Sequence, residues 1–223
     1  ARRGLDVGLA ARRGVADPAE LQGLFVRLAR NTGCESSGEE LAAASGLAKN
    51  TVRRYLDYLE SAGLLRRMPR VHPAGGRFRR MRTFKIHLTA PCLFAGLFGP
   101  VGPGHPALAA LTETGVLAQW QGSTQQSGLH FARLPEGPVD LIGLDPDSGR
   151  PAWACALAGR DDSLDGAGVE GLIAFARRNA PLRWLGATTR TKAGLRNHGG
   201  LEVWHRPAGQ YCYEVARRVA EEG

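Results

Sequence analysis

The stretch SGEELAAASGLAKNTVRRYLDYL, residues 37–59, decides the fold of the N-terminal part of this chain. Ser37 and Glu40 have the spacing of a capping box, in which each side chain accepts a backbone N–H at the start of a helix. Gly46 marks the turn after that short helix, and a new helix begins at Asn50. Four apolar side chains then recur at helical spacing, at Val52, Tyr55, Leu56 and Leu59. The stretch therefore predicts two helices joined by a tight turn, the second of them amphipathic.

The flanking residues extend this pattern on both sides. Before it, Pro18 can open a helix capped by Asp17, and apolar residues at helical spacing continue to a stop near Gly33. After it, residues 64–68 and 83–88 have strand character, with a turn at 73–76 between them. This is the order of a winged helix-turn-helix, which we expect over residues 19–90, after a linker over residues 1–18.

Positive charge is concentrated in one segment. The formal net charge of the chain is +8 at pH 7. Between Lys49 and Lys85, eleven Lys and Arg residues stand against two acids, Asp57 and Glu60, so this segment carries +9 and the rest of the chain −1. Localised positive charge of this kind is typical of a protein that binds a polyanion.

We expect these basic residues to contact double-stranded DNA from two elements. A recognition helix presents a short polar N-terminus to the major groove, and a wing adds phosphate contacts. The candidate residues are Lys49, Asn50, Thr51, Arg53 and Arg54 on the helix, and Arg70, Arg77, Arg79, Arg80 and Arg82 in the wing. Arg and Thr outnumber Asn and Gln there, which favours contacts to the DNA backbone over reading of bases. The alternative is a protein–protein module whose arginines are solvated or meet an acidic partner.

The second half of the chain alternates between helix and strand patterns. We expect a connector over residues 91–105, a domain over 106–206, and a C-terminal helix or tail over 207–223. Within that domain, helices are expected near 106–121 and 166–178, and strands near 129–133, 139–144, 152–158, 183–188 and 201–205. This alternation predicts a small mixed sheet flanked by helices, so the fold class is α/β or α+β.

Composition limits the compartment and the partners. No apolar run approaches the ~20 residues that span a bilayer, and the first five residues are not followed by the apolar core of a signal peptide. The four cysteines are far apart and form no C-x-x-C pair, which argues against a zinc site. We therefore expect a cytoplasmic protein with reduced cysteines and no membrane partner.

Several stretches resemble a known family. Residues 40–42 (ELA), 46–56 (GLAKNTVRRYL), 59–60 (LE) and 85–93 (KIHLTAPCL) resemble the region that follows the ATPase module in prokaryotic AAA-type P-loop ATPases. In that family a winged helix leads into a domain of unknown function that resembles a PD-(D/E)XK nuclease. The resemblance extends over residues 21–191 and implies the same arrangement here. This sequence contains no G-x-x-x-x-G-K-[ST] motif, so the ATPase module was either lost or left out of it.

The resemblance also implies where a nuclease site would lie. Glu113 matches a Glu on the first helix of the family's second domain, and Asp140 matches the Asp of a Glu-Val-Asp strand. Ala156 and Ala158 stand where a Glu-x-Lys strand has its Glu and Lys. Such nucleases hold Mg²⁺ with carboxylates and use the Lys to orient water. The resemblance thus implies a site without catalytic activity. Asp140 and Glu113 would form at most a weak metal site. No cofactor is expected, and Mg²⁺ or Mn²⁺ would bind only if the Glu-x-Lys pair were restored.

Three origins of the alanines stay open: decay of the site with the fold kept as a binding platform, deliberate replacement of a Glu-x-Lys pair, and core packing. The register of this match is open by one or two residues, because Cys155 and Leu157 also fit the strand.

We predict a duplex DNA-binding protein without catalytic activity, associated with a AAA-type ATPase. The alternatives are a metal-dependent DNA nuclease disabled at Ala156 and Ala158, and a protein-interaction module of such an ATPase.

Overall fold

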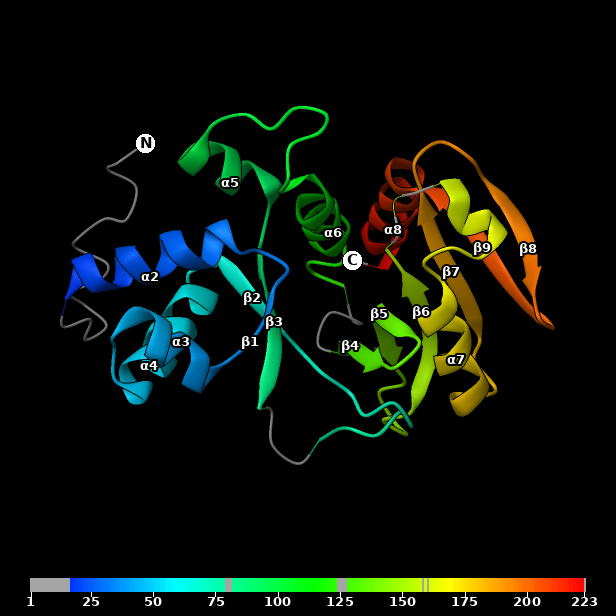
Figure 1. Ribbon diagram of the computed structural model, residues 1–223, viewed down its shortest axis with the longest axis horizontal. Helices are drawn as coiled ribbons and strands as arrows, with labels where there is room; N and C mark the ends of the chain where they lie inside the picture. Colours follow the sequence, from blue (N-terminus) through cyan, green and yellow to red (C-terminus); the bar gives the residue numbers. More distant parts are fainter. Residues whose placement is uncertain (1–16, 79–81, 124–127, 158, 160, 223) are drawn as a thin grey trace. The chain divides into compact units, whose positions relative to one another are not determined.

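The computed structural model describes residues 17–78, 82–123, 128–157, 159 and 161–222 (Figure 1). Over these residues the chain is α+β, as the sequence predicted, with a three-stranded sheet, a six-stranded mixed sheet and seven α-helices. The chain divides into two compact units. Unit 1 comprises residues 1–67 and 82–114, and unit 2 comprises residues 68–81 and 115–223. Both units are therefore discontinuous in sequence.

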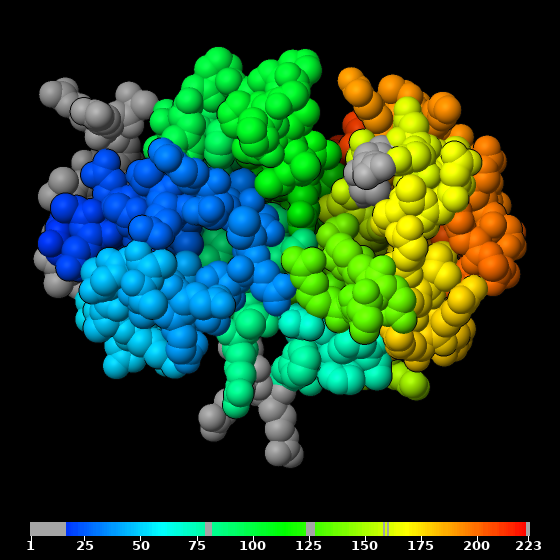
Figure 2. Space-filling model, in the orientation of Figure 1, coloured from blue at the N-terminus to red at the C-terminus, as the bar shows by residue number. Residues whose placement is uncertain are grey.

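Unit 1 begins with three helices, α2 (Pro18–Arg30), α3 (Gly38–Ser45) and α4 (Lys49–Ser61). Their ends follow the predicted caps. The Asp17 carboxylate accepts the N–H of Ala19 at 2.8 Å, and Ser37 and Glu40 form the reciprocal capping box with bonds of 3.2 and 2.7 Å. Helix α3 ends at Gly46, whose φ of +71° favours glycine. The three helices, dark blue to cyan in Figure 2, pack around one apolar core.

A three-stranded sheet of order β1-β3-β2 completes this core. Strands β2 (Leu65–Pro69) and β3 (Thr83–Leu88) match the prediction, whereas β1 (Glu35–Ser37) was not predicted because its three residues are polar. The expected connector contains helix α5 (Pro91–Phe98), which packs Phe94 into the core of unit 1. Helix α6 (Leu108–Ala118) then begins in unit 1 and ends in unit 2.

The segment between β2 and β3 differs from the expected wing. Residues 68–81 belong to unit 2, where the Val71 side chain is fully buried and its N–H donates to the Phe131 carbonyl at 2.8 Å. The predicted turn at 73–76 is present, closed by a bridge between Val71 and Arg77. The difference arises because Met68 and Val71 are apolar and are buried in unit 2, so the turn docks there instead of standing free.

Unit 2 is built on a six-stranded sheet of order β4-β5-β6-β7-β9-β8. Its strands are β4 (Leu129–Leu134), β5 (Gly137–Leu144), β6 (Pro151–Ala156), β7 (Trp184–Thr189), β8 (Gly194–His198) and β9 (Leu201–Pro207). Strands β4, β5 and β6 form an antiparallel meander, β6, β7 and β9 run parallel, and β8 is an antiparallel edge strand. The sequence predicted every strand except β8, which is mostly polar and exposed.

Helices cover both faces of this sheet (Figure 1). After a 3₁₀ helix, η2 (Asp161–Asp165), helix α7 (Glu170–Asn179) packs on β4, β5 and β6, and helix α8 (Ala208–Glu222) packs on β7 and β9. Ala154 and Ala156 are buried on the α7 face with Phe175. Cys155 is buried on the α8 face with Tyr211. Successive residues of β6 thus point to opposite faces, as strand geometry requires.

Gly75 is required where the docked turn meets the end of α7. Its φ is +83°, and a Cβ there would lie 2.3 Å from Asn179 Oδ1, whose amide donates to the Pro73 carbonyl at 2.9 Å. We expect Gly75→Ala to lower the free energy of unfolding of unit 2 by at least about 1–2 kcal/mol. Urea denaturation followed by tryptophan fluorescence measures this, because all four tryptophans lie in unit 2.

Gly76→Ala is the matched control for this measurement. No atom lies within 4 Å of a Cβ at Gly76, and its φ is not positive. Equal urea midpoints for the two variants would contradict the docking of the turn.

Candidate nucleic-acid interface

Helix α4 buries an apolar face and exposes a polar, basic one. The buried side chains, each no more than 2% exposed, are Val52, Tyr55, Leu56 and Leu59. Asn50, Arg53 and Arg54 are exposed, and Thr51 is half-buried. Burial of one face therefore fixes which side chains the helix presents to a partner.

Lys49, the first residue of α4, forms an ion pair with Glu39 of α3. The hydrogen bond from Lys49 is the main cause that lowers the pKa of Glu39, and the charge of Arg82 adds to it. The two paired side chains are 64% and 66% exposed, so this is a weak surface pair that an incoming phosphate can replace. Lys49 and Arg82 thus lie within electrostatic reach of the same carboxylate.

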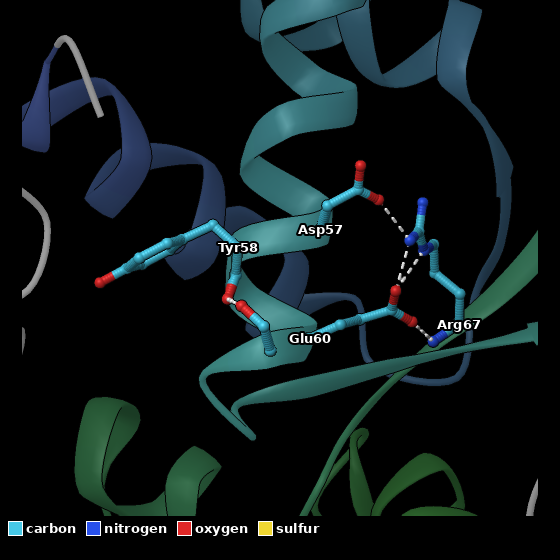
Figure 3. Close-up of polar contacts among 5 residues, drawn as sticks. Asp57, Tyr58, Glu60 and Arg67 are labelled. Atoms are coloured by element: carbon cyan, nitrogen blue, oxygen red, sulfur yellow. Dashed lines mark hydrogen bonds and ion pairs between the residues drawn. The ribbon is translucent and has the colours of Figure 1, made fainter. Parts of the chain in front are cut away.

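Two arginines of β2 are held inside unit 1. Figure 3 shows Arg67 between two carboxylates of α4: its guanidinium donates to Glu60 at 2.9 Å and to Asp57 at 2.7 Å. Burial lowers the pKa of Arg67, but these two carboxylates more than reverse the shift. Burial lowers the pKa of its neighbour Arg66. Both acids of the basic segment are therefore bound to Arg67.

The structure divides the wing arginines that the sequence grouped together. Arg82 is exposed in unit 1, whereas Arg70 and Arg77 belong to unit 2, where Arg70 is half-buried and Arg77 exposed. Arg79 and Arg80 lie outside the described residues. The division follows from the docking of residues 68–77 on unit 2.

In unit 2 the docked turn borders a polar cleft of about 700 Å³. Four arginines line the cleft, namely Arg77, Arg150, Arg178 and Arg183. Arg178 donates to Glu136 at 2.6 Å, and Arg183 donates to Asp145 at 2.8 Å. The last three arginines were not predicted from the sequence, because they come from separate elements and no local motif joins them.

Glu113, the expected ligand on α6, is bound within unit 1. Lys85 is 4% exposed, and its ammonium donates to Glu113 Oε1 at 2.7 Å. His87 Nε2 lies 3.5 Å from the same oxygen. Burial is the main cause that lowers the pKa of His87, to about 3, and the positive charges of Lys85 and Arg66 contribute to the same shift. The structure thus gives Glu113 a buried cationic side chain as its partner.

Asp140 lies on β5 beside the end of β6. Its carboxylate accepts the N–H of Leu157 at 2.9 Å. Burial raises the pKa of the Cys155 thiol, and the negative charge of Asp140 raises it further. Cys155 and Leu157 pack on the α8 face, whereas Ala156 is 1% exposed on the α7 face. Ala158 lies outside the described residues. A Glu-x-Lys pair with both side chains on the α8 face would therefore occupy positions 155 and 157.

Among the residues that the structure describes, no group of three or more His, Cys, Asp or Glu side chains could hold a metal ion. Asp140 and Glu113 belong to different units, and each is bound by protein groups of its own. The four cysteines are all free.

A family model described as a domain of unknown function, DUF8612, matches residues 5–100. These residues are less than half of the chain and include α2 to α5. No curated protein and no solved structure matches the chain. The similarity carries no function, so the resemblance to the ATPase-associated region stays a prediction. No helix in the described parts of the chain is long and apolar enough to cross a membrane.

We expect Glu113→Ala to lower the free energy of unfolding of unit 1 by about 3–5 kcal/mol, because it removes a partner of the buried Lys85 ammonium. Urea denaturation followed by far-UV circular dichroism measures the loss. The double variant Lys85→Met/Glu113→Leu removes both charges and should recover most of it. If Glu113 instead served as a metal ligand, Glu113→Ala and the unmodified protein would be equally stable in EDTA. Mn²⁺ would then raise the Tm of the unmodified protein but not that of the variant.

Proposed function

We propose that this protein binds double-stranded DNA, mainly through phosphate contacts made by α4. The observation that carries the proposal is the exposed side of this helix, on which Lys49, Asn50, Arg53 and Arg54 lie while the opposite side is fixed in the core. Guanidinium and ammonium groups bind phosphate oxygens with charge-assisted hydrogen bonds. Polar residues at the N-terminus of a recognition helix are those that enter a major groove.

The electrostatics around α4 support a polyanionic partner. Residues 49–85 carry +9, and their two acids, Asp57 and Glu60, are bound to Arg67. The cleft of unit 2, where Arg77 and Arg150 lie beside the ion-paired Arg178 and Arg183, offers a second phosphate-binding surface. Free cysteines suit the reducing cytoplasm, where we place both the protein and its DNA.

The resemblance of residues 40–60 and 85–93 leads us to propose in addition that the DNA-binding part is associated with a AAA-type ATPase module. A protein-interaction role for unit 1 is the alternative, and the DNA-binding measurement separates the two.

We expect fluorescence anisotropy across a salt series to show duplex binding with a slope of log K against log[salt] of roughly −4 to −5. Arg53→Glu should weaken binding at least about tenfold and make the slope less steep by about 1–2, because it replaces a phosphate contact by a repulsive charge. Arg27→Glu, at an exposed position on α2, makes the same charge change away from α4 and is the control. No binding at low salt, or equal losses in both variants, would contradict the role of α4 and favour an acidic protein partner.

We propose that unit 2 has no nuclease activity and that Ala156 serves core packing. A carboxylate at this position would enter an apolar cluster that includes Val139, Leu172 and Phe175. Ala156→Glu should therefore lower the free energy of unfolding by at least about 2 kcal/mol, whereas Ala193→Glu, on an exposed loop, should change it little. A folded Ala156→Glu/Ala158→Lys variant that cleaves DNA with Mg²⁺ or Mn²⁺ would refute this assignment.

A further inference from the structure

We propose that unit 2 binds a nucleotide, with its base in an aromatic pocket between the sheet and α8. The pocket has a volume of about 220 Å³ and lies within unit 2. The residues that carry the argument are Trp120, Trp184, Trp204, Arg206, Tyr211 and Arg218. This site is separate from α4 and stands independently of duplex binding by unit 1.

Stacked tryptophans form a rigid aromatic wall at the pocket. Trp120, Trp153 and Trp184 stack in sequence, with ring centroids 5.1 and 4.9 Å apart and interplanar angles of 18° and 10°. Trp184 lies flat on its strand because Gly186 has no side chain: a Cβ there would come within 2.5 Å of the Trp184 ring. Two members of the stack, Trp120 and Trp184, line the pocket. Aromatic surfaces held in this way bind bases by stacking, with little preference for the base.

Trp204 extends this wall toward solvent. It pairs in register with Gly186 on the neighbouring strand and is 46% exposed. The Arg206 guanidinium lies over its ring, 5.2 Å from the centroid. Trp204 thus offers an accessible aromatic ring beside the pocket.

Two buried polar groups lie at the pocket. Trp120 and Tyr211 are 1% and 8% exposed, so the indole N–H and the hydroxyl are largely removed from water. Burial raises the pKa of Tyr211, and a hydrogen bond from the Trp120 indole opposes this shift; the hydroxyl is therefore protonated at neutral pH. The hydroxyl can donate to the ring nitrogens and carbonyl oxygens that a base carries on its edges.

Charge and size define the class of ligand. Two arginines, Arg206 and Arg218, and one acid, Glu214, line the pocket, and Arg206 pairs with Glu214 at 2.9 Å. This net positive charge favours an anion and disfavours the cations that aromatic cages hold. The volume lies below the ~300–1,000 Å³ of ordinary ligand pockets, so the pocket suits one base, with the phosphate at the arginines.

Isothermal titration calorimetry with dAMP tests the site. We expect binding with a Kd below about 1 mM, quenching of tryptophan fluorescence, and weaker binding of deoxyadenosine, which lacks the phosphate. Trp204→Ala and Arg218→Ala should each weaken dAMP binding about tenfold or more. The controls are Tyr213→Ala and Arg217→Ala, which lie on α8 but do not line this pocket. All four side chains are exposed, and urea midpoints verify that the variants fold.

The source of the nucleotide is resolved by a single-stranded oligonucleotide and a blunt duplex. Binding of the single strand that is tighter than that of dAMP and is weakened by Trp204→Ala, with duplex binding unchanged by this variant, would assign the pocket to an unpaired base of a nucleic acid. Binding of dAMP with single-strand binding unaffected by Trp204→Ala would assign it to a free nucleotide. Absence of binding by dAMP and the single strand, or equal losses in the control variants, would overturn the proposal. Arg53→Glu should leave dAMP binding unchanged, so failure of this site is distinguishable from failure of α4.

Discussion

Burial of Val71 in unit 2 is the constraint on which the arrangement of the chain depends. Strand β2 ends at Pro69 in the sheet of unit 1, and two residues later the chain contributes a fully buried side chain to the core of unit 2. The backbone bond to Phe131 fixes the register of this insertion. Because residues 68–81 precede β3 and the rest of unit 2 begins within α6, at Gly115, neither core can be completed from one continuous stretch of sequence.

The arginines of the basic segment divide into those with structural roles and those that face solvent. Arg67 compensates the loss of water around its guanidinium with two carboxylates of α4, and in doing so it ties β2 to that helix. Arg53 on α4 and Arg77 on the docked turn are exposed. A count of charges along the sequence weights all of these residues equally, although a guanidinium already bound to two carboxylates adds little to the field that a polyanion meets.

The parts of the fold that depend on local chemistry could be predicted from the sequence. The Asp17 cap, the capping box and the apolar face of α4 involve residues close together in sequence, and each is present as expected. The four prolines and four glycines of residues 91–106 predict a connector, yet Pro91 lies in the first turn of α5, where proline is favoured. The pair of Lys85 with Glu113 and the four-arginine cleft join residues far apart in the chain, and no periodicity in the sequence reports such contacts.

The two faces of the large sheet explain why a nuclease site and an aromatic pocket exclude each other in unit 2. The α8 face holds Cys155 and Leu157 beside Asp140, together with the stacked tryptophans. An ionised glutamate and lysine at positions 155 and 157 would have to lose water in this apolar surrounding, which is costly without close partners. Burial also raises the pKa of the Cys155 thiol, so this residue stays protonated and is a poor nucleophile. A face without these charges can pack against α8, and that packing places Tyr211 and Arg218 opposite Trp184 at the pocket. The apolar character of this sheet face thus both disfavours a charged pair at positions 155 and 157 and allows the aromatic side chains to pack there.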